Sequence, residues 1–457
     1  MSEKRSGFAS NIGFILAAAG SAIGLGNIWK FPGKVGENGG GTFIVVYLII
    51  VAFIGFAIML AEISLGRKAQ KNSVRAFKQI DNRWSFVGKI GILTGFIILS
   101  YYSVVGGWVL KYITTYITGA DFGGDTAAFF GGFISSPVEP LLWHFLFMSM
   151  TVFIVIKGVS AGIEKVSKFL MPLLFIILIV ITIRSVTLPG AEQGLSFLFS
   201  FNFEDINPTM MIVALGQAFF SLSLGMGIMI TYGSYVSKKN SLITSVAMIT
   251  TLDTLIALLA GFAIVCAVFA TDPSLIGGQG GGFAFISLPN VFAAMPAGSI
   301  FGLLFFILLF FAALTSAMSI LEGTVAFVTE EFHIPRAKAT IGLGLVMGLL
   351  GCGYSLSQGA MDIKLPWFDF ANGLQWQPMG NVMELMTDNL LMPLTALFVC
   401  IFVGWVWKPE QAIKEVRQDG QFAFSLAPIW AFLIRFICPL AIIVILVTTL
   451  VFGKGVS

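Results

Sequence analysis

The chain of 457 residues is 57% hydrophobic and only 11% charged, a composition outside the range of ordinary soluble globular domains. Its formal net charge is only +3, and its Lys and Arg residues are spread over the short segments between apolar stretches, which argues against a nucleic-acid partner. The composition therefore predicts an integral membrane protein.

Uncharged apolar stretches of about 20 residues, the length that crosses a bilayer as an α-helix, recur along the whole chain. They predict eleven spanning helices and no soluble domain. We expect no cleavable signal, because the first apolar stretch lacks a small-residue cleavage site and belongs to the first helix. The predicted helices lie near residues 11–35, 40–66, 88–116, 141–157, 167–186, 210–236, 241–270, 299–328, 338–358, 385–407 and 427–451.

Charge is distributed unevenly between the connecting segments. The segment at 67–83 is rich in Lys and Arg, whereas the segment at 119–140 carries acidic residues and no Lys or Arg. By the positive-inside rule the first of these is cytoplasmic, so the N-terminus is expected inside and, with an odd number of helices, the C-terminus outside. The longer segments 187–208, 271–298 and 355–383 are then extracellular and are expected to form partly structured lids.

The cysteines and histidines give no sign of a metal site or a disulfide. The cysteines lie within or beside apolar stretches and lack ligand spacing, so we expect small buried apolar side chains. The two histidines are expected to be packing or solvated residues. These residues are Cys266, Cys352, Cys400, Cys438, His144 and His333.

Two Gly-rich stretches, Gly20–Asn27 and Ser221–Gly227, interrupt the first and sixth predicted spans. Unwound backbone is tolerated at bilayer depth only where it lines a cavity or is buried in protein. A matched pair of interrupted spans indicates the substrate and ion site of a secondary transporter. We therefore expect two five-helix halves, 11–186 and 210–407, each beginning with a broken helix, and an additional helix at 427–451.

The predicted breaks can hold both an anion and a cation. Helix ends at a break present N–H groups to a carboxylate and C=O groups to a cation. The side chains expected nearby carry only oxygen donors of the kind that bind alkali or alkaline-earth ions, and sodium is the natural candidate because transporters use its gradient. These side chains are Ser21, Asn27, Ser221, Ser223, Asp253, Thr315 and Ser316.

Several motifs resemble the neurotransmitter:sodium symporter family, in its bacterial amino-acid branch, and the resemblance covers nearly the whole chain. It implies an all-α polytopic membrane protein with the LeuT-like 5+5 inverted repeat, unwound helices 1 and 6, and a place in the bacterial inner membrane. The family normally has twelve helices, so an eleven-helix chain resembles its shorter bacterial members. The motifs are Gly20 to Pro32 followed by Asn38–Gly41, then Glu62 with Gly66–Arg67, Tyr101–Tyr102 with Gly107–Trp108, Gln217–Gly225, and Leu314–Ser316.

The resemblance implies two sodium sites. The first would combine the Ala22 carbonyl, Asn27, Ser221 and Asp253 with the carboxylate of the substrate. The second would use the carbonyls of Gly20, Ile23 and Ala312 and the hydroxyls of Thr315 and Ser316. A substrate that completes an ion site is coupled to that ion, because each raises the affinity for the other.

Departures from the animal members of the family bear on the anion and the substrate. Asp253 stands where chloride-dependent members have Asn, so its carboxylate supplies the balancing charge and no chloride requirement is expected. Gly24 stands where monoamine carriers have an Asp, which implies an amino-acid substrate.

The resemblance also implies a substrate pocket without a charged side chain, in which the Tyr102 hydroxyl is aimed at the substrate carboxylate. Burying a charged substrate side chain there would go uncompensated, and Met226 can adapt to different shapes. We therefore expect apolar or aromatic L-amino acids. The predicted pocket residues are Ser21, Ala22, Gly24, Leu25, Gly26, Ile98, Tyr102, Val105, Phe220, Ser221, Ser223, Met226, Ser316 and Ile320.

Gate residues follow from the same resemblance. Outside, Lys30 would pair with Glu384, and Gln217 and Phe220 would complete the lid. Inside, Arg5 would pair with Glu330, with Phe8 plugging the vestibule and Tyr235 steadying Arg5; by spacing alone Glu331 is an alternative partner. These gate residues are Lys30, Gln217, Phe220, Glu384, Arg5, Phe8, Tyr235 and Glu330.

More than one role is open for two acidic residues inside the predicted helices, and more than one activity is open for the whole chain. Glu62 is expected to hydrogen-bond the unwound backbone in preference to binding an ion, and Glu322 either relays protons or supports the inner gate. A membrane enzyme is disfavoured, because no nucleophile with a base and no metal triad occurs at the breaks. A transporter-like sensor that binds an amino acid without flux remains an alternative, and the oligomeric state is not predicted.

Overall fold

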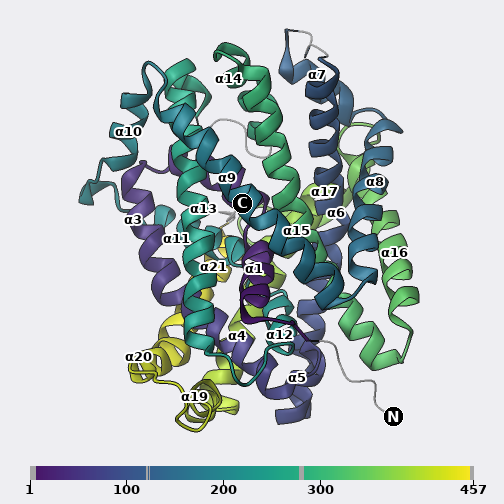
Figure 1. The fold of residues 1–457 in the computed structure, drawn as a ribbon, viewed down its shortest axis with the longest axis vertical. Coiled ribbons are helices and arrows are strands. Elements are labelled where there is room, and N and C mark those ends of the chain that lie inside the picture. The colour runs from purple at the N-terminus through teal and green to yellow at the C-terminus, as the bar shows by residue number, and fades with distance from the viewer. Residues whose placement is uncertain (1–6, 120–121, 123, 277–281, 453–457) are drawn as a thin grey trace.

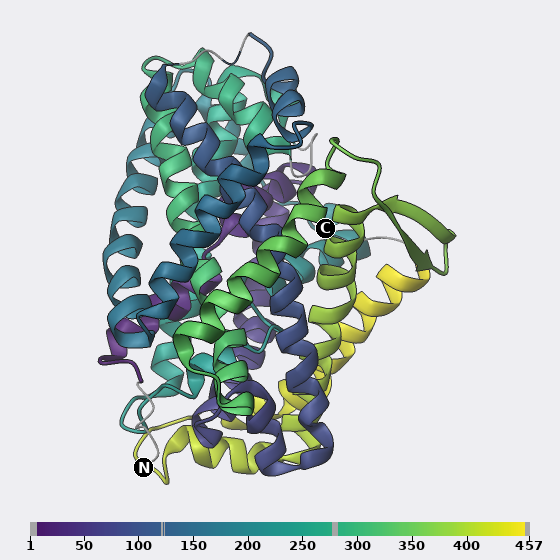
Figure 2. The same ribbon diagram turned by 90° about the vertical axis from the view of Figure 1, so that its right-hand side faces the viewer.

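The computed structural model describes residues 7–119, 122, 124–276 and 282–452. Figures 1 and 2 show a bundle of helices that run mostly along the long axis of the molecule, with α1 (Asn11–Ala22) near its middle. Within the described residues, nine helices are long and apolar enough to cross a membrane. The bent pair Asn11–Ala22 and Gly26–Glu37, with 55° between its parts, can count as one further span.

The first half of the chain contains the first broken helix and four further spans. Its elements are α1 (Asn11–Ala22), the π-helical turn η1 (Gly26–Lys30), α2 (Phe31–Glu37), α3 (Gly41–Ile50), η2 (Val51–Gly55), α4 (Phe56–Ala69), α5 (Ser73–Ile80), η3 (Asn82–Trp84), α6 (Ser85–Thr118), α7 (Thr126–Ile134), α8 (Glu139–Ile156), η4 (Val159–Glu164) and α9 (Lys165–Val186).

The rest of the chain begins its spans with a second interrupted helix, α11 and α12. Its elements are α10 (Ala191–Phe199), η5 (Phe203–Asp205), α11 (Pro208–Ser221), α12 (Ile228–Gly233), α13 (Leu242–Thr271), η6 (Pro273–Leu275), η8 (Phe283–Ser287), α14 (Leu288–Ala294), α15 (Gly298–Phe332), α16 (Arg336–Ser357), β1 (Lys364–Asp369), β2 (Gly373–Pro378), α17 (Met379–Glu384), η9 (Leu385–Leu391), α18 (Met392–Ile401), η10 (Phe402–Val406), α19 (Pro409–Arg417), α20 (Ala427–Phe432), η11 (Leu433–Ile437) and α21 (Cys438–Phe452).

Both predicted interruptions are present. In the first, α1 ends at Ala22 and Ile23 has extended backbone angles. In the second, α11 ends at Ser221 and the helix resumes at Ile228. Gly225 between them has φ +76°, and a Cβ there would lie 2.3 Å from the Met392 carbonyl oxygen, so the close approach of α18 requires glycine at this position.

The segments between the spans are more structured than the sequence indicated. The predicted lid segments contain the helices α10 and α14 and an antiparallel hairpin, β1 and β2, in which Pro366 pairs with Trp376 and Phe368 with Leu374. The short helices α5 and α19 were also not anticipated. The all-α polytopic class is nevertheless confirmed, since one two-stranded hairpin is the only sheet in the described part of the chain.

Candidate substrate and ion site

The two interrupted helices are joined to each other through polar side chains at their breaks. Ser223 donates a hydrogen bond from Oγ to the Ser21 carbonyl over 3.0 Å, and Gln217 donates from Nε2 to the Gly26 carbonyl over 3.1 Å. All three of Ser21, Ser223 and Gln217 are buried. Backbone that lipid could not satisfy is therefore satisfied from the opposite break.

Glu62 of α4 contacts the unwound backbone between α11 and α12. Its Oε1 accepts a hydrogen bond from the Gly225 backbone N–H over 2.8 Å, and the side chain is fully buried. Its Oε2 has no hydrogen-bond partner among the described residues. This contact is the structural role expected for Glu62 at the sixth helix.

The first predicted set of sodium ligands comes together as a buried triangle of Asn27, Ser221 and Asp253. Asn27 donates from Nδ2 to Ser221 Oγ and to Asp253 Oδ1, each over 2.8 Å. Ser221 donates from Oγ to Asp253 Oδ2 over 2.7 Å, and the Asn27 Oδ1 accepts from the Gly24 N–H over 3.1 Å. The triangle links η1, α11 and α13, and each corner carries an oxygen suited to a hard cation.

The second predicted set gathers where α15 passes the end of α1. Ser316 Oγ lies 3.3 Å from the Gly20 carbonyl oxygen and 3.3 Å from that of Ile23. One residue earlier, Thr315 Oγ1 lies 3.1 Å from the Ala312 carbonyl oxygen. Ser316 therefore brings its hydroxyl to the carbonyls of Gly20 and Ile23, and its neighbour Thr315 lies beside that of Ala312. All five predicted ligands offer oxygen atoms, which fits an alkali cation.

A cavity of about 350 Å³ lies between these two sets of donors. None of its lining side chains is charged, and Tyr102 accepts a hydrogen bond at its hydroxyl from the Leu25 N–H over 3.3 Å. The lining residues are Ser21, Ala22, Gly24, Leu25, Gly26, Asn27, Ile98, Tyr102, Phe220, Ser223, Met226, Ser316 and Ile320.

Two predicted pocket residues do not line this cavity. Val105 is buried on α6, almost one turn beyond Tyr102, so its prediction as a pocket wall is not supported. Ser221 instead belongs to the triangle with Asp253. Asn27, predicted only as an ion ligand, reaches the cavity as well.

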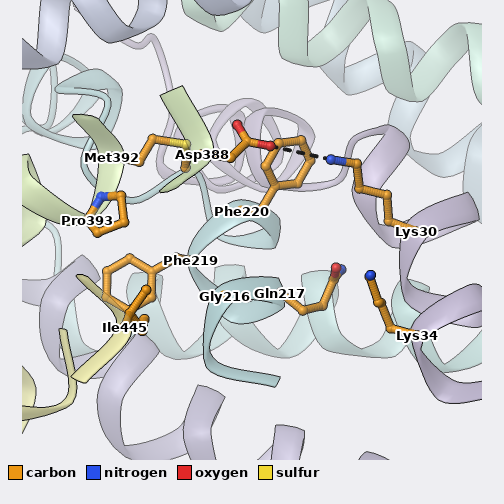
Figure 3. A pocket seen from close by; sticks show the side chains of 10 residues that line it. All are labelled: Lys30, Lys34, Gly216, Gln217, Phe219, Phe220, Asp388, Met392, Pro393 and Ile445. Atoms are coloured by element: carbon orange, nitrogen blue, oxygen red, sulfur yellow. Dashed lines mark hydrogen bonds and ion pairs between the residues drawn. The ribbon is translucent and has the colours of Figure 1, made fainter. Parts of the chain in front are cut away.

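A second cavity of about 460 Å³ lies on the other side of Phe220 (Figure 3). The Phe220 ring lines both cavities, and Lys30 lies over it with Nζ 4.2 Å from the ring centroid. Figure 3 shows Lys30 and Asp388 meeting above this ring, with Nζ 3.5 Å from Oδ2. An aromatic ring capped by an ion pair thus separates the two cavities.

The ion-pair contact of Lys30 in the structure is to Asp388, and not to the predicted partner Glu384. Glu384 instead accepts a hydrogen bond from the Tyr354 hydroxyl over 2.6 Å. Asp388 lies four residues further on, inside the π-helical turn η9, and Tyr101 also donates to it, over 3.3 Å. The wider π turn changes which face its side chains occupy relative to an ordinary α-helix.

On the opposite side, Phe8 packs at the end of α1. Its ring centroid lies 5.5 Å from that of Tyr232 and 6.1 Å from that of Tyr235. The Tyr235 hydroxyl donates to Glu322 Oε1 over 2.7 Å, and Glu322 also forms an ion pair with Arg336. This ion pair favours the supporting role for Glu322 over the proton-relay alternative.

The predicted partner of Glu330, Arg5, lies outside the described residues, so that pairing stays a prediction. Glu330 accepts hydrogen bonds from the backbone and side-chain nitrogens of Asn72, each over 2.9 Å. Glu331, the alternative partner by spacing, forms an ion pair of 2.7 Å with Arg75.

The sequence did not single out three residues that the structure places at the site. Asp388 caps Phe220, Lys34 lines the second cavity, and Tyr47 donates from its hydroxyl to Ser221 Oγ over 3.4 Å. An acid inside a predicted span was the available signal for Asp388. Nothing in the local sequence marked Tyr47.

Comparison with known proteins identifies the family. Residues 5–121 and 136–455 match the sodium:neurotransmitter symporter family. The chain belongs to this family. The resemblance read from the sequence is thereby confirmed.

Similar members of the sodium:neurotransmitter symporter family match this chain almost end to end. An uncharacterized sodium-dependent transporter of Bacillus subtilis, YhdH, is 38% identical over 449 residues, which cover 96% of each chain. An uncharacterized sodium-dependent transporter of Haemophilus influenzae is 36% identical over 470 residues, covering 98% of this chain and 99% of the other.

A solved structure with the same fold is that of MhsT in complex with L-phenylalanine. It superposes with a TM-score of 0.87 at 41% identity and covers 97% of this chain and 100% of that one. The similarity confirms the LeuT-like, all-α architecture expected from the sequence.

Proposed function

We propose that this chain is a sodium-coupled symporter of neutral apolar or aromatic L-amino acids, working by alternating access. The observation that carries the proposal is the uncharged cavity between two clusters of oxygen donors, at the breaks of α1 and α11. A site of this kind can hold a zwitterion and small cations together.

Two sodium ions are proposed. One would be held by the Ala22 carbonyl with Asn27, Ser221, Asp253 and the substrate carboxylate. The other would be held by the carbonyls of Gly20, Ile23 and Ala312 with Thr315 and Ser316. Because the substrate carboxylate completes the first set, substrate and ion would raise the affinity for each other, which couples uptake to the sodium gradient.

Chloride should be dispensable. Asp253 is fully buried and contacts two of the other proposed ligands, so its carboxylate supplies a fixed negative charge beside the first ion. A bound chloride ion would therefore not be needed to balance the sodium charge.

The substrate class follows from what lines the cavity. Ile98, Met226 and Ile320 offer apolar contact, and no charged lining residue is present to pair with a charged substrate side chain. Ser21 Oγ is buried and has no hydrogen-bond partner among the described residues, so it is available to a polar group of the amino acid. The similar protein MhsT was solved with L-phenylalanine.

Alternating access would use Phe220 and the Lys30–Asp388 pair on the outside and Phe8 with the Arg5–Glu330 pair on the inside. We further propose two five-helix repeats, 11–186 and 210–407, in the bacterial inner membrane with the N-terminus cytoplasmic. Each repeat would then begin with one of the two interrupted helices.

Uptake of labelled leucine into proteoliposomes, with competition by unlabelled amino acids, tests the proposal. Competition by Phe, Trp, Tyr and Val but not by Lys or Glu is expected. Strong competition by Lys or Glu would refute an apolar pocket. Binding of leucine without any uptake would instead identify a sensor that has kept the transporter fold.

A further inference from the structure

Most of one face of the β1–β2 hairpin is apolar, aromatic and exposed. Pro366 pairs with Trp376 and Phe368 with Leu374, and directly paired residues of antiparallel strands lie on the same face. The exposed fractions are 53% for Phe368, 63% for Leu374 and 64% for Trp376. Phe370, in the turn between the strands, is 71% exposed. We call these five residues the aromatic hairpin face.

The hairpin is held in place at both of its ends. At its base, the Met379 N–H donates to the Ile363 carbonyl over 2.9 Å, and at its turn the Phe370 N–H donates to the Leu450 carbonyl over 2.9 Å. Leu450 belongs to the last helix, α21. Figure 2 shows the hairpin, drawn as arrows, projecting from the side of the bundle beside the end of α21, drawn in yellow. The aromatic hairpin face is therefore presented by a fixed element.

This face continues the lipid-facing surface of α21. The segment Ala427–Val451 is long and apolar enough to span a membrane, and its outward side chains are apolar and exposed, among them Leu440 at 60%, Val447 at 43% and Val451 at 42%. In a spanning helix these side chains face lipid. The Phe370–Leu450 hydrogen bond joins the hairpin to the end of that surface, where the hydrocarbon core gives way to headgroups.

The chemistry of the face suits that boundary. Its four paired positions carry Pro, Phe, Leu and Trp, and Lys364, paired with Pro378 at the base of the hairpin, is the one charged strand residue on the same face. Aromatic side chains concentrate where headgroups meet acyl chains, and a Lys beside them extends its charge to the headgroups. The five side chains expose on the order of 500 Å², less than the roughly 800 Å² per partner of a stable protein interface. The bilayer is therefore the better occupant than a second copy of the chain.

We propose that the aromatic hairpin face inserts into the headgroup–acyl boundary of the bilayer leaflet at that end of α21. The hairpin leads directly into α17 and η9, which carries Asp388. Anchored in this way, it holds the outer end of the gate helix at a fixed depth in the membrane.

Spin-label accessibility tests the proposal on the full chain in vesicles of phosphatidylcholine and phosphatidylglycerol. One label is placed at Trp376→Cys on the face, and an aqueous reference at Asp362→Cys, a position 79% exposed before β1. The unsubstituted chain gives the labelling background of its own cysteines. The label at 376 should collide several times more often with oxygen, relative to a water-soluble nickel complex, than the label at 362.

Equal, water-like ratios at the two positions would overturn the proposal. So would a label at 376 that is shielded from both reagents and shows spin–spin broadening that disappears on dilution with unlabelled protein, because that pattern identifies a second copy on the face.

A second measurement uses the native side chains and does not depend on an introduced cysteine. Phospholipids brominated near the headgroup end of the acyl chain should quench the tryptophan emission of the unsubstituted chain more than that of Trp376→Leu. Trp367→Leu, in the same hairpin but on its other face, serves as the matched control and should retain the quenched component. Quenching that is unchanged in Trp376→Leu contradicts insertion.

Discussion

Asn27 and Asp253 are joined by a hydrogen bond of 2.8 Å between Nδ2 and Oδ1, and both side chains are fully buried. The contact connects the π turn after the first break to the middle of α13. A buried carboxylate is costly unless cations or donors compensate it, and among the residues that the structure describes the donors are Asn27 and Ser221. A cation bound beside Asp253 would supply the remaining compensation.

The first prediction concerns the negative charge of the Asp253 carboxylate. Transport by the unsubstituted chain should be indifferent to replacing chloride with gluconate. Asp253→Asn keeps an oxygen ligand but removes the negative charge, so sodium-dependent uptake should collapse. Uptake by each protein, with chloride and with gluconate, is the measurement.

Thr250→Val provides the control for Asp253→Asn. Thr250 is buried on the same helix, but within the described part of the chain its hydroxyl bonds only to carbonyls of its own preceding turn, those of Val246 and Ala247, so uptake should be nearly unchanged. Normal uptake by Asp253→Asn would show that the carboxylate does not take part in the site.

The second prediction concerns the donors on α15. Replacing Thr315 and Ser316 together by Ala removes two of the five proposed ligands of the second ion, and sodium-dependent uptake should be abolished while the protein remains folded. The matched variant is Thr329→Ala, whose hydroxyl bonds only to its own helix. Sodium-dependent uptake that persists in the double variant would remove these hydroxyls from the ion site.

The third prediction distinguishes Asp388 from Glu384 as the ion-pair partner of Lys30. A double-mutant cycle of Lys30→Met and Asp388→Asn, read as the concentration for half-maximal uptake, should give a coupling of about 0.5–1 kcal/mol, because the pair is partly exposed. The same cycle with Glu384→Gln should give a smaller coupling, because Glu384 makes no ion-pair contact with Lys30 in the described structure. Coupling of Lys30 to Glu384 but not to Asp388 would favour the pairing expected from the sequence.

The fourth prediction concerns specificity. Met226→Phe reduces the free volume of the cavity and should penalise Trp and Tyr relative to Val and Leu by about 10- to 200-fold, the range for small size differences in an apolar pocket. Competition against labelled leucine uptake measures the shift. An unchanged order of preference would show that Met226 does not face the substrate side chain.

Gly24 gives a complementary test of the cavity. A Cβ at this position would lie 2.9 Å from Ser316 Oγ and 3.0 Å from the Tyr102 hydroxyl oxygen, so Gly24→Ala should weaken uptake of every amino acid. Gly24→Asp should weaken it further, because it places a negative charge near the substrate carboxylate. A change in preference without a general loss would contradict this position for Gly24.

The sequence predicted the parts of the site that depend on backbone chemistry. Glycines at 225 and 227 allow the positive φ angles that interrupt the sixth helix, and oxygen-bearing side chains such as Asn27 and Ser316 could be expected beside the breaks. Spans were recognisable by length and hydropathy, because lipid requires both.

What the sequence could not give depends on helical phase and on contacts between distant segments. Glu384 and Asp388 lie four residues apart, and only the π turn η9 determines which of them meets Lys30. Val105 lies close to Tyr102 along α6 yet does not reach the cavity. The hairpin was missed because its two strands are only six residues long each and lie in a segment with Gly, Pro and aromatic residues that resembles an irregular loop.

The measurement that tests sodium-coupled symport most directly is uptake of labelled leucine or phenylalanine into proteoliposomes under imposed ion gradients. An inward sodium gradient should drive accumulation above the external concentration, and replacing sodium with choline or potassium should abolish it. Accumulation that is independent of sodium and follows a proton gradient would contradict the account.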